Sequence, residues 1–381
     1  MSDQSLRGIT WNHSRALPPL VAASQRFEET CPGVRIHWEK RSLDEFGHAQ
    51  LATLASEYDL LIIDHPMLGE VHRDGTLCDL RHLAPATALA ELESDALGPC
   101  FSSYEYMECL YALPVDAAAP AASFRADLLD REGHQIPSDW DGLITLARCG
   151  IVSMPGFPVD VFMNFMGMCA SRNGVCLRED QIFDRDVALR CLDELRELSS
   201  LMDDSIYDLN PIALYEAMSS GDQIAYCPFA YTYSNYSRPG FAAHILHFSN
   251  PVPLRGAEAM RTVLGGTGIA VSAQSTNISS AVEFCLFVAG RECQANLYGI
   301  CGGQPARRSS WNNSLLNHVS NGFFENTTAS IETAYVRPRY PGYVALQRAA
   351  GLPIVEFLRG GSTTVHALER VEELYRKSVS P

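Results

Sequence analysis

The amino-acid sequence predicts an α/β protein, because strand-like and helix-like segments alternate along the chain. Residues 6–11 and 33–38 have strand character, and between them apolar residues recur at the spacing of a helix packed on a sheet. Residues 58–64 read YDLLIID, an almost wholly apolar run that is typical of a strand buried on both faces. A chain of 381 residues is expected to form two or three domains.

The first part of the chain is predicted to run β-α-β-α-β. Its strands lie at residues 6–11, 33–38 and 58–64, and its helices at 18–29 and 43–56. In a parallel sheet of this kind, ligands bind at the carboxyl ends of the strands. The loops that follow Trp11 and Asp64 are therefore the first places to expect a binding site.

The rest of the chain is predicted to be mainly helical. An Ala- and Pro-rich segment at 114–120 and a Pro-Val-Pro run at 251–253 are interpreted as crossings between two parts of the molecule. Helices are expected at 122–130, 140–149, 159–171, 186–202 and 278–288. Strands are expected at 223–227 and 269–271, with an aromatic loop at 229–236 and a glycine-rich segment at 265–268 ahead of the second strand.

The charge balance is acidic, with 29 basic and 45 acidic residues and a net charge of −16. This charge disfavours nucleic acid and anionic membranes as partners. No apolar run reaches the roughly 18 residues of a membrane-spanning helix, so no membrane insertion is expected. The chain opens MSDQSLR, without the apolar stretch of a secretion signal. We expect a cytoplasmic protein if Met1 is the native start, and a periplasmic or extracellular one if a signal was removed.

The twelve cysteines show no C-x-x-C pattern, and many lie among apolar neighbours. Free cysteines in such surroundings behave as small hydrophobic residues. So many thiols in an oxidising compartment would risk mispairing, which favours buried, reduced thiols. Disulfides and a metal or reactive site are the alternatives.

Four stretches of sequence carry a resemblance to a known family. The first is residues 58–80, where Asp-His-Pro ends a strand and Gly-Thr-Leu-Cys-Asp-Leu follows. The second is YALPV at 111–115, continued by IPSDWDGL at 136–143. The third is GGTGIAVS at 265–272 with GQPAR at 303–307, and the fourth is RYPGY at 339–343. In this order they resemble the extracellular solute-binding proteins of ABC transporters, specifically the sugar-type, family 1-like group.

The resemblance implies a periplasmic-binding-protein-like fold, with two α/β lobes, a hinge and an interlobe ligand cleft. Residues 1–112 and 255–310 are expected in lobe 1, and residues 113–254 and 311–381 in lobe 2. The implied function is a solute-binding protein that closes its lobes around a small polar ligand, either a sugar or a small carboxylate. An ABC permease is the expected partner if the protein is exported. No cofactor is expected.

An enzyme or a ligand sensor of the cytoplasm, built on the same scaffold, is the alternative function. The sequence favours a binding protein over an enzyme, since no H-E-x-x-H, G-x-S-x-G or P-loop motif occurs. The catalytic residues of an enzyme therefore stay unknown, although His13, His65 and Asp64 are the natural candidates for proton transfer. No metal site is expected, because the nearest histidine pair has no clear third ligand.

Five candidate ligand contacts follow the first and third predicted strands. Trp11, His13 and Arg15 lie in the first loop, where an aromatic ring, an imidazole and a guanidinium suit a polar or anionic ligand. Asp64 and His65 end the third strand, where the carboxylate can accept hydrogen bonds from ligand hydroxyls. The alternative for the loop after the first strand is a simple helix cap with Arg15 on the surface. The alternative for the end of the third strand is that Asp64 caps the next helix and His65 is solvated or hydrogen-bonded inside the protein.

Four further candidates lie later in the chain. Tyr231 and Tyr233 belong to the densest aromatic cluster and would stack on a sugar if they share one face. Gly266 would let backbone amides approach the ligand, or simply form a turn. Arg307 is a candidate anion contact, although two adjacent arginines are more often solvated.

Overall fold

The computed structural model describes residues 4–42, 51–178 and 180–380. It confirms the predicted α/β class. The chain divides into two compact units. Unit 1 comprises Met1–Ala118, Gly265–Val319 and Arg337–Pro341, and unit 2 comprises Ala119–Leu264, Ser320–Val336 and Gly342–Pro381. The chain changes unit after residues 118, 264, 319, 336 and 341, whereas the sequence analysis expected a change of lobe after residues 112, 254 and 310.

Unit 1 contains a five-stranded sheet with the strand order β2-β1-β3-β10-β6. The strands are β1 (Gln4–Trp11), β2 (Val34–Arg41), β3 (Leu60–Ile63), β6 (Leu113–Ala118) and β10 (Gly265–Val271). Strand β1 runs parallel to β2 and β3, whereas β10 is antiparallel to β3 and β6. The carboxyl ends of β1, β3 and β6 therefore lie at the same edge of the sheet as the start of β10.

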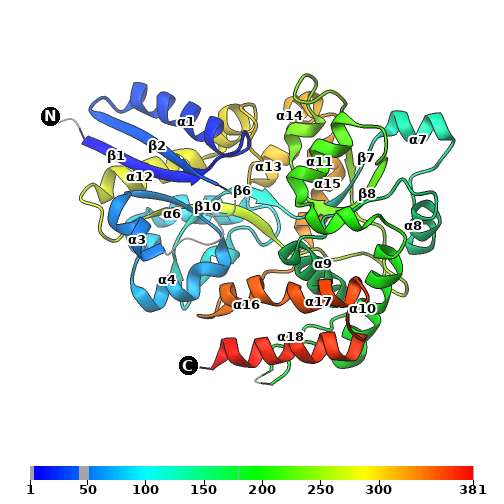
Figure 1. Cartoon of the computed structure of the whole chain (residues 1–381). Helices are drawn as coiled ribbons and strands as arrows, with labels where there is room; N and C mark the ends of the chain where they lie inside the picture. Colours follow the sequence, from blue (N-terminus) through cyan, green and yellow to red (C-terminus); the bar gives the residue numbers. More distant parts are fainter. Residues whose placement is uncertain (1–3, 43–50, 179, 381) are drawn as a thin grey trace. The chain divides into compact units, whose positions relative to one another are not determined.

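Helices cover both faces of this sheet. In Figure 1, α1 (Leu17–Thr30) lies on one side of the strands, and α3 (Leu51–Glu57) and α4 (Leu68–Asp74) lie on the other. Phe27 of α1 packs edge-on against Phe284 of α12 (Ile278–Ala289), with 5.3 Å between ring centroids. The predicted β-α-β-α-β beginning is confirmed for the described residues; the first part of the predicted helix 43–56, residues 43–50, lies outside them.

The smaller elements of unit 1 connect these layers. They are η1 (His65–Met67), α5 (Leu80–Leu83), α6 (Ala86–Ser94), η2 (Ser102–Tyr104), β4 (Glu105–Tyr106), β5 (Cys109–Leu110), the π-helix η5 (Cys293–Tyr298), α13 (Arg308–Trp311) and α14 (Ser314–Val319).

Unit 2 packs a small antiparallel sheet, β8-β7-β9, with many helices. Its strands are β7 (Pro120–Phe124), β8 (Tyr226–Tyr231) and β9 (His247–Ser249). Its helices are α7 (Ala126–Glu132), α8 (Trp140–Ala147), α9 (Pro158–Ser171), α10 (Arg185–Ser199), η3 (Asp204–Asp208), α11 (Pro211–Ser220), η4 (Ser234–Ser237), α15 (Phe323–Glu332), α16 (Tyr343–Ala349), α17 (Gly351–Leu358) and α18 (Thr364–Val379). Helix α9 is buried along most of its length and contacts α10, α16 and α17.

Two predictions for unit 2 were wrong. Residues 122–124, predicted as the start of a helix, form the end of β7, and the helix begins only at Ala126. The fully buried Ala121 and Ala122 fit a closely packed strand, so packing overrides the helix propensity of alanine there. The predicted aromatic loop at 229–236 begins inside β8, which runs on to Tyr231.

Within residues 4–42, 51–178 and 180–380, no helix is both long and apolar enough to cross a membrane. The same residues contain no group of three or more His, Cys, Asp or Glu side chains that could hold a metal ion. All twelve cysteines lie in the described part of the chain, and all are free thiols.

Candidate functional site

The candidate site of unit 1 is the sheet edge where β1, β3 and β6 end and β10 begins. Pairing of Gly268 with Ile63 and of Thr267 with Asp116 brings β10 between the ends of β3 and β6. The register of β10 shifts between Thr267 and Gly268, and irregularities of this kind are common beside functional sites. Chain segments that are distant in sequence therefore meet at one edge.

An ion pair between Arg15 and Asp116 is the first polar feature of this edge. Arg15 Nε donates to Asp116 Oδ1 at 2.9 Å, and Nη2 donates to Oδ2. Both side chains are almost fully buried, with 5% and 0% of their surface exposed. The sequence predicted Arg15 but not Asp116, which lies inside the run interpreted as a crossing. A single acidic residue in an otherwise apolar strand was the available signal.

His13 is held in one tautomer beside this pair. The backbone N–H of Arg15 donates to His13 Nδ1 at 2.9 Å, so the proton of the neutral ring is on Nε2. Burial and, to a lesser extent, the charge of Arg15 lower the pKa of His13 to about 4. At neutral pH, His13 therefore presents an uncharged imidazole.

A second ion pair joins Asp64 to Arg337. Arg337 Nη2 donates to both carboxylate oxygens of Asp64 at 2.7 Å, and the backbone N–H of His65 donates to Oδ1 at 2.9 Å. Burial opposes ionisation of Asp64, but the charge of Arg337 and the interactions with His65 outweigh it and lower the pKa of Asp64 to about 2. Arg337 is a functional candidate that the sequence analysis missed, because no motif marked it.

His65 is fully buried beneath this pair. Its Nδ1 lies 3.2 Å from Asp64 Oδ1, yet neither ring nitrogen makes a hydrogen bond to a residue in the described part of the chain. The ring meets Tyr104 edge-on, with centroids 6.2 Å apart. Burial, assisted by the charge of Arg337, lowers the pKa of His65 to about 4. His65 is thus a neutral group inside the wall of the site.

Two other predicted residues shape the same edge. Trp11 is buried at the end of β1 and pairs with Arg41 of β2. Gly266 adopts a φ of +94°, and a Cβ atom there would collide with the carbonyl oxygen of Asp116. Only glycine permits this close approach of β10 to β6, and a role of Gly266 in ligand binding stays a prediction.

The predicted aromatic residues belong to unit 2. Tyr231 ends β8, and Tyr233 is buried against Tyr215, with ring centroids 6.2 Å apart. Tyr215 also packs on Tyr236, whose hydroxyl donates to Glu216 at 2.6 Å. These contacts give Tyr233 a packing role in unit 2, and its role in ligand binding stays a prediction.

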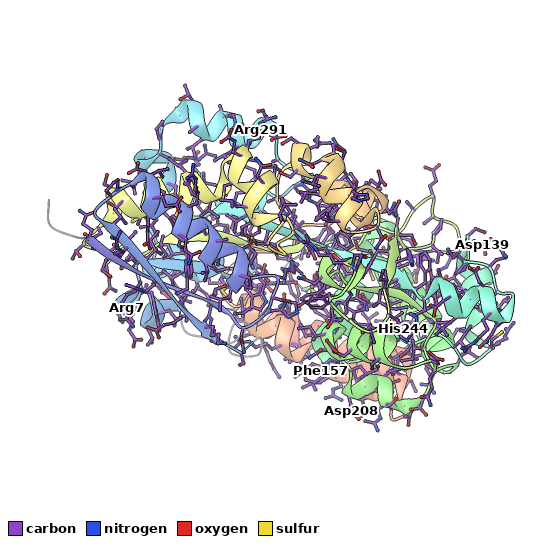
Figure 2. All side chains as sticks on the ribbon, turned by 90° about the horizontal axis from the view of Figure 1, so that it is seen from above. Arg7, Asp139, Phe157, Asp208, His244 and Arg291 are labelled. Carbon is purple, nitrogen blue, oxygen red and sulfur yellow. The ribbon has the colours of Figure 1, made fainter. Side chains whose placement is uncertain are left out.

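Arg307 lies in a separate polar cluster of unit 1. Its guanidinium donates to Glu91 at 2.8 and 2.7 Å, to Asp95 at 3.1 Å and to the carbonyl of Ala289 at 2.6 Å. Arg291, labelled in Figure 2, lies 3.4 Å from the Asp95 carboxylate in the same cluster. Arg307 is buried, not solvated, and a ligand anion would compete with the carboxylates of Glu91 and Asp95 for its guanidinium.

Asp160 is a perturbed carboxyl that the sequence analysis did not single out. It lies in the first turn of α9 in unit 2, after Phe157, which is exposed and labelled in Figure 2. Burial raises the pKa of Asp160 to about 7. A partly protonated carboxyl near neutral pH can donate as well as accept hydrogen bonds.

Comparison by sequence finds neither a matching family model nor a matching curated protein. Comparison by structure finds extensive similarity. Maltose-bound MalE3 of T. maritima aligns with a TM-score of 0.84 at 15% identity, covering 98% of this chain and 99% of its own. A solute-binding protein of an Agrobacterium radiobacter ABC transporter, in complex with ribitol, aligns at 0.81 with 18% identity and 99% coverage of each chain. A Thermotoga lettingae ABC transporter solute-binding protein with bound α-D-tagatose aligns at 0.82, with 16% identity and coverages of 99% and 100%.

The class of fold is therefore that of the two-lobe α/β periplasmic binding proteins. The chain has in particular the fold of sugar- and polyol-binding proteins of ABC transporters, matched along nearly its whole length. This confirms the fold that the sequence resemblance implied.

Proposed function

We propose that this protein is a solute-binding protein of the ABC-transporter type whose ligand is an uncharged, hydroxyl-rich molecule, a sugar or a polyol. The observation that supports this most strongly is the match of fold over almost the entire chain to proteins described with maltose, ribitol and tagatose. Identity of 15–18% does not carry ligand specificity, so the ligand class is argued from the residues.

The charges at the sheet edge of unit 1 favour a neutral ligand over the small carboxylate considered from the sequence. Arg15 and Arg337, the cations that would attract a carboxylate, each pair with an aspartate. His13 has a pKa near 4 and adds no positive charge at neutral pH. Carboxylates accept hydrogen bonds, and an uncharged imidazole forms hydrogen bonds without adding charge, so both suit the hydroxyl groups of a neutral ligand.

The alternative of a cytoplasmic enzyme or sensor has less support. Asp64, with a pKa of about 2, and His65, with a pKa of about 4, are both poor general bases at neutral pH. His65 is also fully buried. The matched structures are described as binding proteins, which favours binding without chemistry.

The partner and compartment follow from the proposed function. A solute-binding protein of this type delivers its ligand to an ABC permease from outside the cytoplasmic membrane, so we propose export and a permease partner. The hinge and the ligand cleft implied by the sequence resemblance stay predictions. So does the contribution of Tyr231 and Tyr233 to ligand binding.

A thermal-shift screen tests the proposal. Purified protein is melted with a panel of mono- and oligosaccharides, alditols and small organic acids. A ligand at 100 times its dissociation constant stabilises the native state by about 2.7 kcal/mol, which gives an easily measured rise in Tm. We expect at least one sugar or alditol to raise Tm. Stabilisation by organic acids alone, or by no member of the panel, contradicts the proposal.

A further inference from the structure

Strand β6 has an irregular position directly before Asp116. In the pairing of β10 with β6, Thr267 pairs with Asp116 and Gly268 pairs with Pro114. Val115, between these two residues of β6, is therefore left without a partner on β10, as the extra residue of a β-bulge is. A bulge changes the face of the sheet to which the side chains after it point. The direction of the Asp116 carboxylate therefore depends on how this irregular position is held.

Two glutamines bond the outer edge of β6. This strand is the last one in the order of the described sheet, so no further strand of that sheet bonds its outer edge. The side-chain amide of Gln294 donates through Nε2 to the carbonyl of Val115 at 3.1 Å. Gln304 donates through Nε2 to the carbonyl of Ala117 at 2.9 Å, and its own carbonyl accepts from the Ala117 N–H at 2.8 Å. The backbone is thus held by a glutamine on each side of Asp116.

Gln294 is itself held in one orientation. It lies in the π-helix η5 and is fully buried. Besides the bond to Val115, its Nε2 donates to the carbonyl of Val288 at 3.1 Å, and its Oε1 accepts from the backbone N–H of Ala306 at 2.8 Å. A primary amide has two N–H donors and one oxygen, so each kind of polar atom in the side chain is engaged. The amide is therefore a rigid support for the carbonyl of Val115.

The amide of Gln294 links the π-helix to the candidate binding site at the sheet edge of unit 1. We propose that Gln294 is a positioning residue for this site. By bonding the carbonyl of Val115, it fixes the irregular position of β6 and so directs the Asp116 carboxylate towards Arg15. This inference rests on the proposed function, in which hydroxyl groups of a neutral ligand bind at this edge. Without the amide, the peptide between Val115 and Asp116 can rotate, and the carboxylate that accepts hydrogen bonds is misplaced.

The ligand affinity of two variants tests the proposal. Gln294→Met removes the amide and keeps an unbranched side chain. The matched control Asn317→Leu removes another buried amide of unit 1, which donates to the carbonyls of Trp311 and Asn313. Each variant is titrated with the sugar or alditol that raises Tm most in the screen. We expect affinity to fall about tenfold or more in Gln294→Met, the worth of a hydrogen bond to a carboxylate, and to be unchanged in Asn317→Leu. Unchanged affinity in Gln294→Met, or an equal loss in both variants, overturns the proposal.

A double-mutant cycle on unfolding tests the same link without a ligand, so it decides the matter even if no sugar or alditol binds and the proposed function fails. If Gln294 acts through Asp116, Gln294→Met should raise the unfolding equilibrium constant about threefold or more beyond its effect in the Asp116→Asn background. Asn317→Leu should have the same effect in both backgrounds. If Gln294→Met does not fold, Gln294→Asn, whose amide is on a shorter side chain, replaces it in both tests. Equal effects of the Gln294 variant in the two backgrounds overturn the proposal.

Discussion

Arg15 and Asp116 form a buried, two-bond ion pair between residues 101 positions apart in the sequence. Arg15 follows β1, whereas Asp116 is inside β6, and β3 and β10 separate these strands in the sheet. The pair therefore ties the first loop of the chain to the far strand of the sheet, across the edge at which ligands bind in such sheets.

Asp116→Asn should strongly destabilise the protein, because it leaves the Arg15 guanidinium buried without a compensating charge. Breaking a buried ion pair from one side costs about 3–5 kcal/mol. Chemical denaturation at neutral pH measures the loss. The control is Glu29→Gln, which breaks an exposed pair with Arg26 on α1 and should cost less than about 1 kcal/mol. An equal decrease in the free energy of unfolding of the two variants would show that the buried Arg15–Asp116 pair stabilises the protein no more than an exposed pair does.

Gly266→Ala should be more damaging than an ordinary glycine substitution at positive φ. Gly240 also has a positive φ, +82°, but a Cβ there would have nothing within 4 Å, so Gly240→Ala should cost about 1 kcal/mol of backbone strain. At Gly266 the methyl group also collides with the backbone of β6, and we expect a loss of about 3 kcal/mol or more. Denaturation curves of the two variants give the comparison. A Gly266→Ala variant as stable as Gly240→Ala would contradict the close approach of β10 to β6.

His65 should make the protein less stable in acid. Its pKa is about 4 when folded, below the value of 6.5 when unfolded, so the folded state binds the proton less readily. The stability that the folded protein gains from keeping His65 neutral is complete above pH 6.5. It is lost as the pH falls towards 4, and the loss is about 3 kcal/mol. The free energy of unfolding of His65→Gln should therefore change less between pH 7 and pH 4 than that of the wild type. The exposed His366 provides the control His366→Gln, which should keep the wild-type dependence.

Asp160 should make the protein more stable in acid than at high pH, which is the reverse of the effect of His65. Its pKa is about 7 when folded and 3.8 when unfolded, so its protonated form favours folding. The stability it contributes is complete below pH 3.8 and is lost as the pH rises to about 7. Asp160→Asn should thus stabilise the protein at pH 8, by up to about 4 kcal/mol. The exposed Asp130→Asn variant should have little effect, and an unstable Asp160→Asn protein at pH 8 would show that the ionised carboxylate is needed.

Local pattern in the sequence predicted the elements that are strongly periodic or strongly apolar. The third strand and helix α9 followed directly from their apolar runs, and the strand-end rule led to His13, Arg15, Asp64 and His65. What could not be predicted was the partner of each charge. Asp116 and Arg337 pair with residues 101 and 273 positions away. The strand order brings β6 with Asp116 to the edge beside Arg15, and a late irregular segment brings Arg337 to Asp64.

The failures have equally physical causes. Residues 120–124 are rich in alanine, and small side chains suit a tightly packed strand as well as a helix, so composition alone did not separate the two. Arg307 has the sequence context of a solvated or ligand-binding arginine, yet two carboxylates of the α6 region bind it. Sequence identifies the charge but not whether the fold supplies its counter-charge.

Isothermal titration calorimetry with matched neutral and acidic ligands tests the central claim most directly. The sugar or alditol found in the thermal-shift screen is titrated into the protein at pH 7, and the corresponding sugar acid is titrated in parallel. We predict saturable binding of the neutral compound with one site per chain and at least tenfold weaker binding of the acid, because the arginines are already paired with aspartates. Tighter binding of the acid, or no saturable binding of any neutral sugar or alditol, would contradict the account.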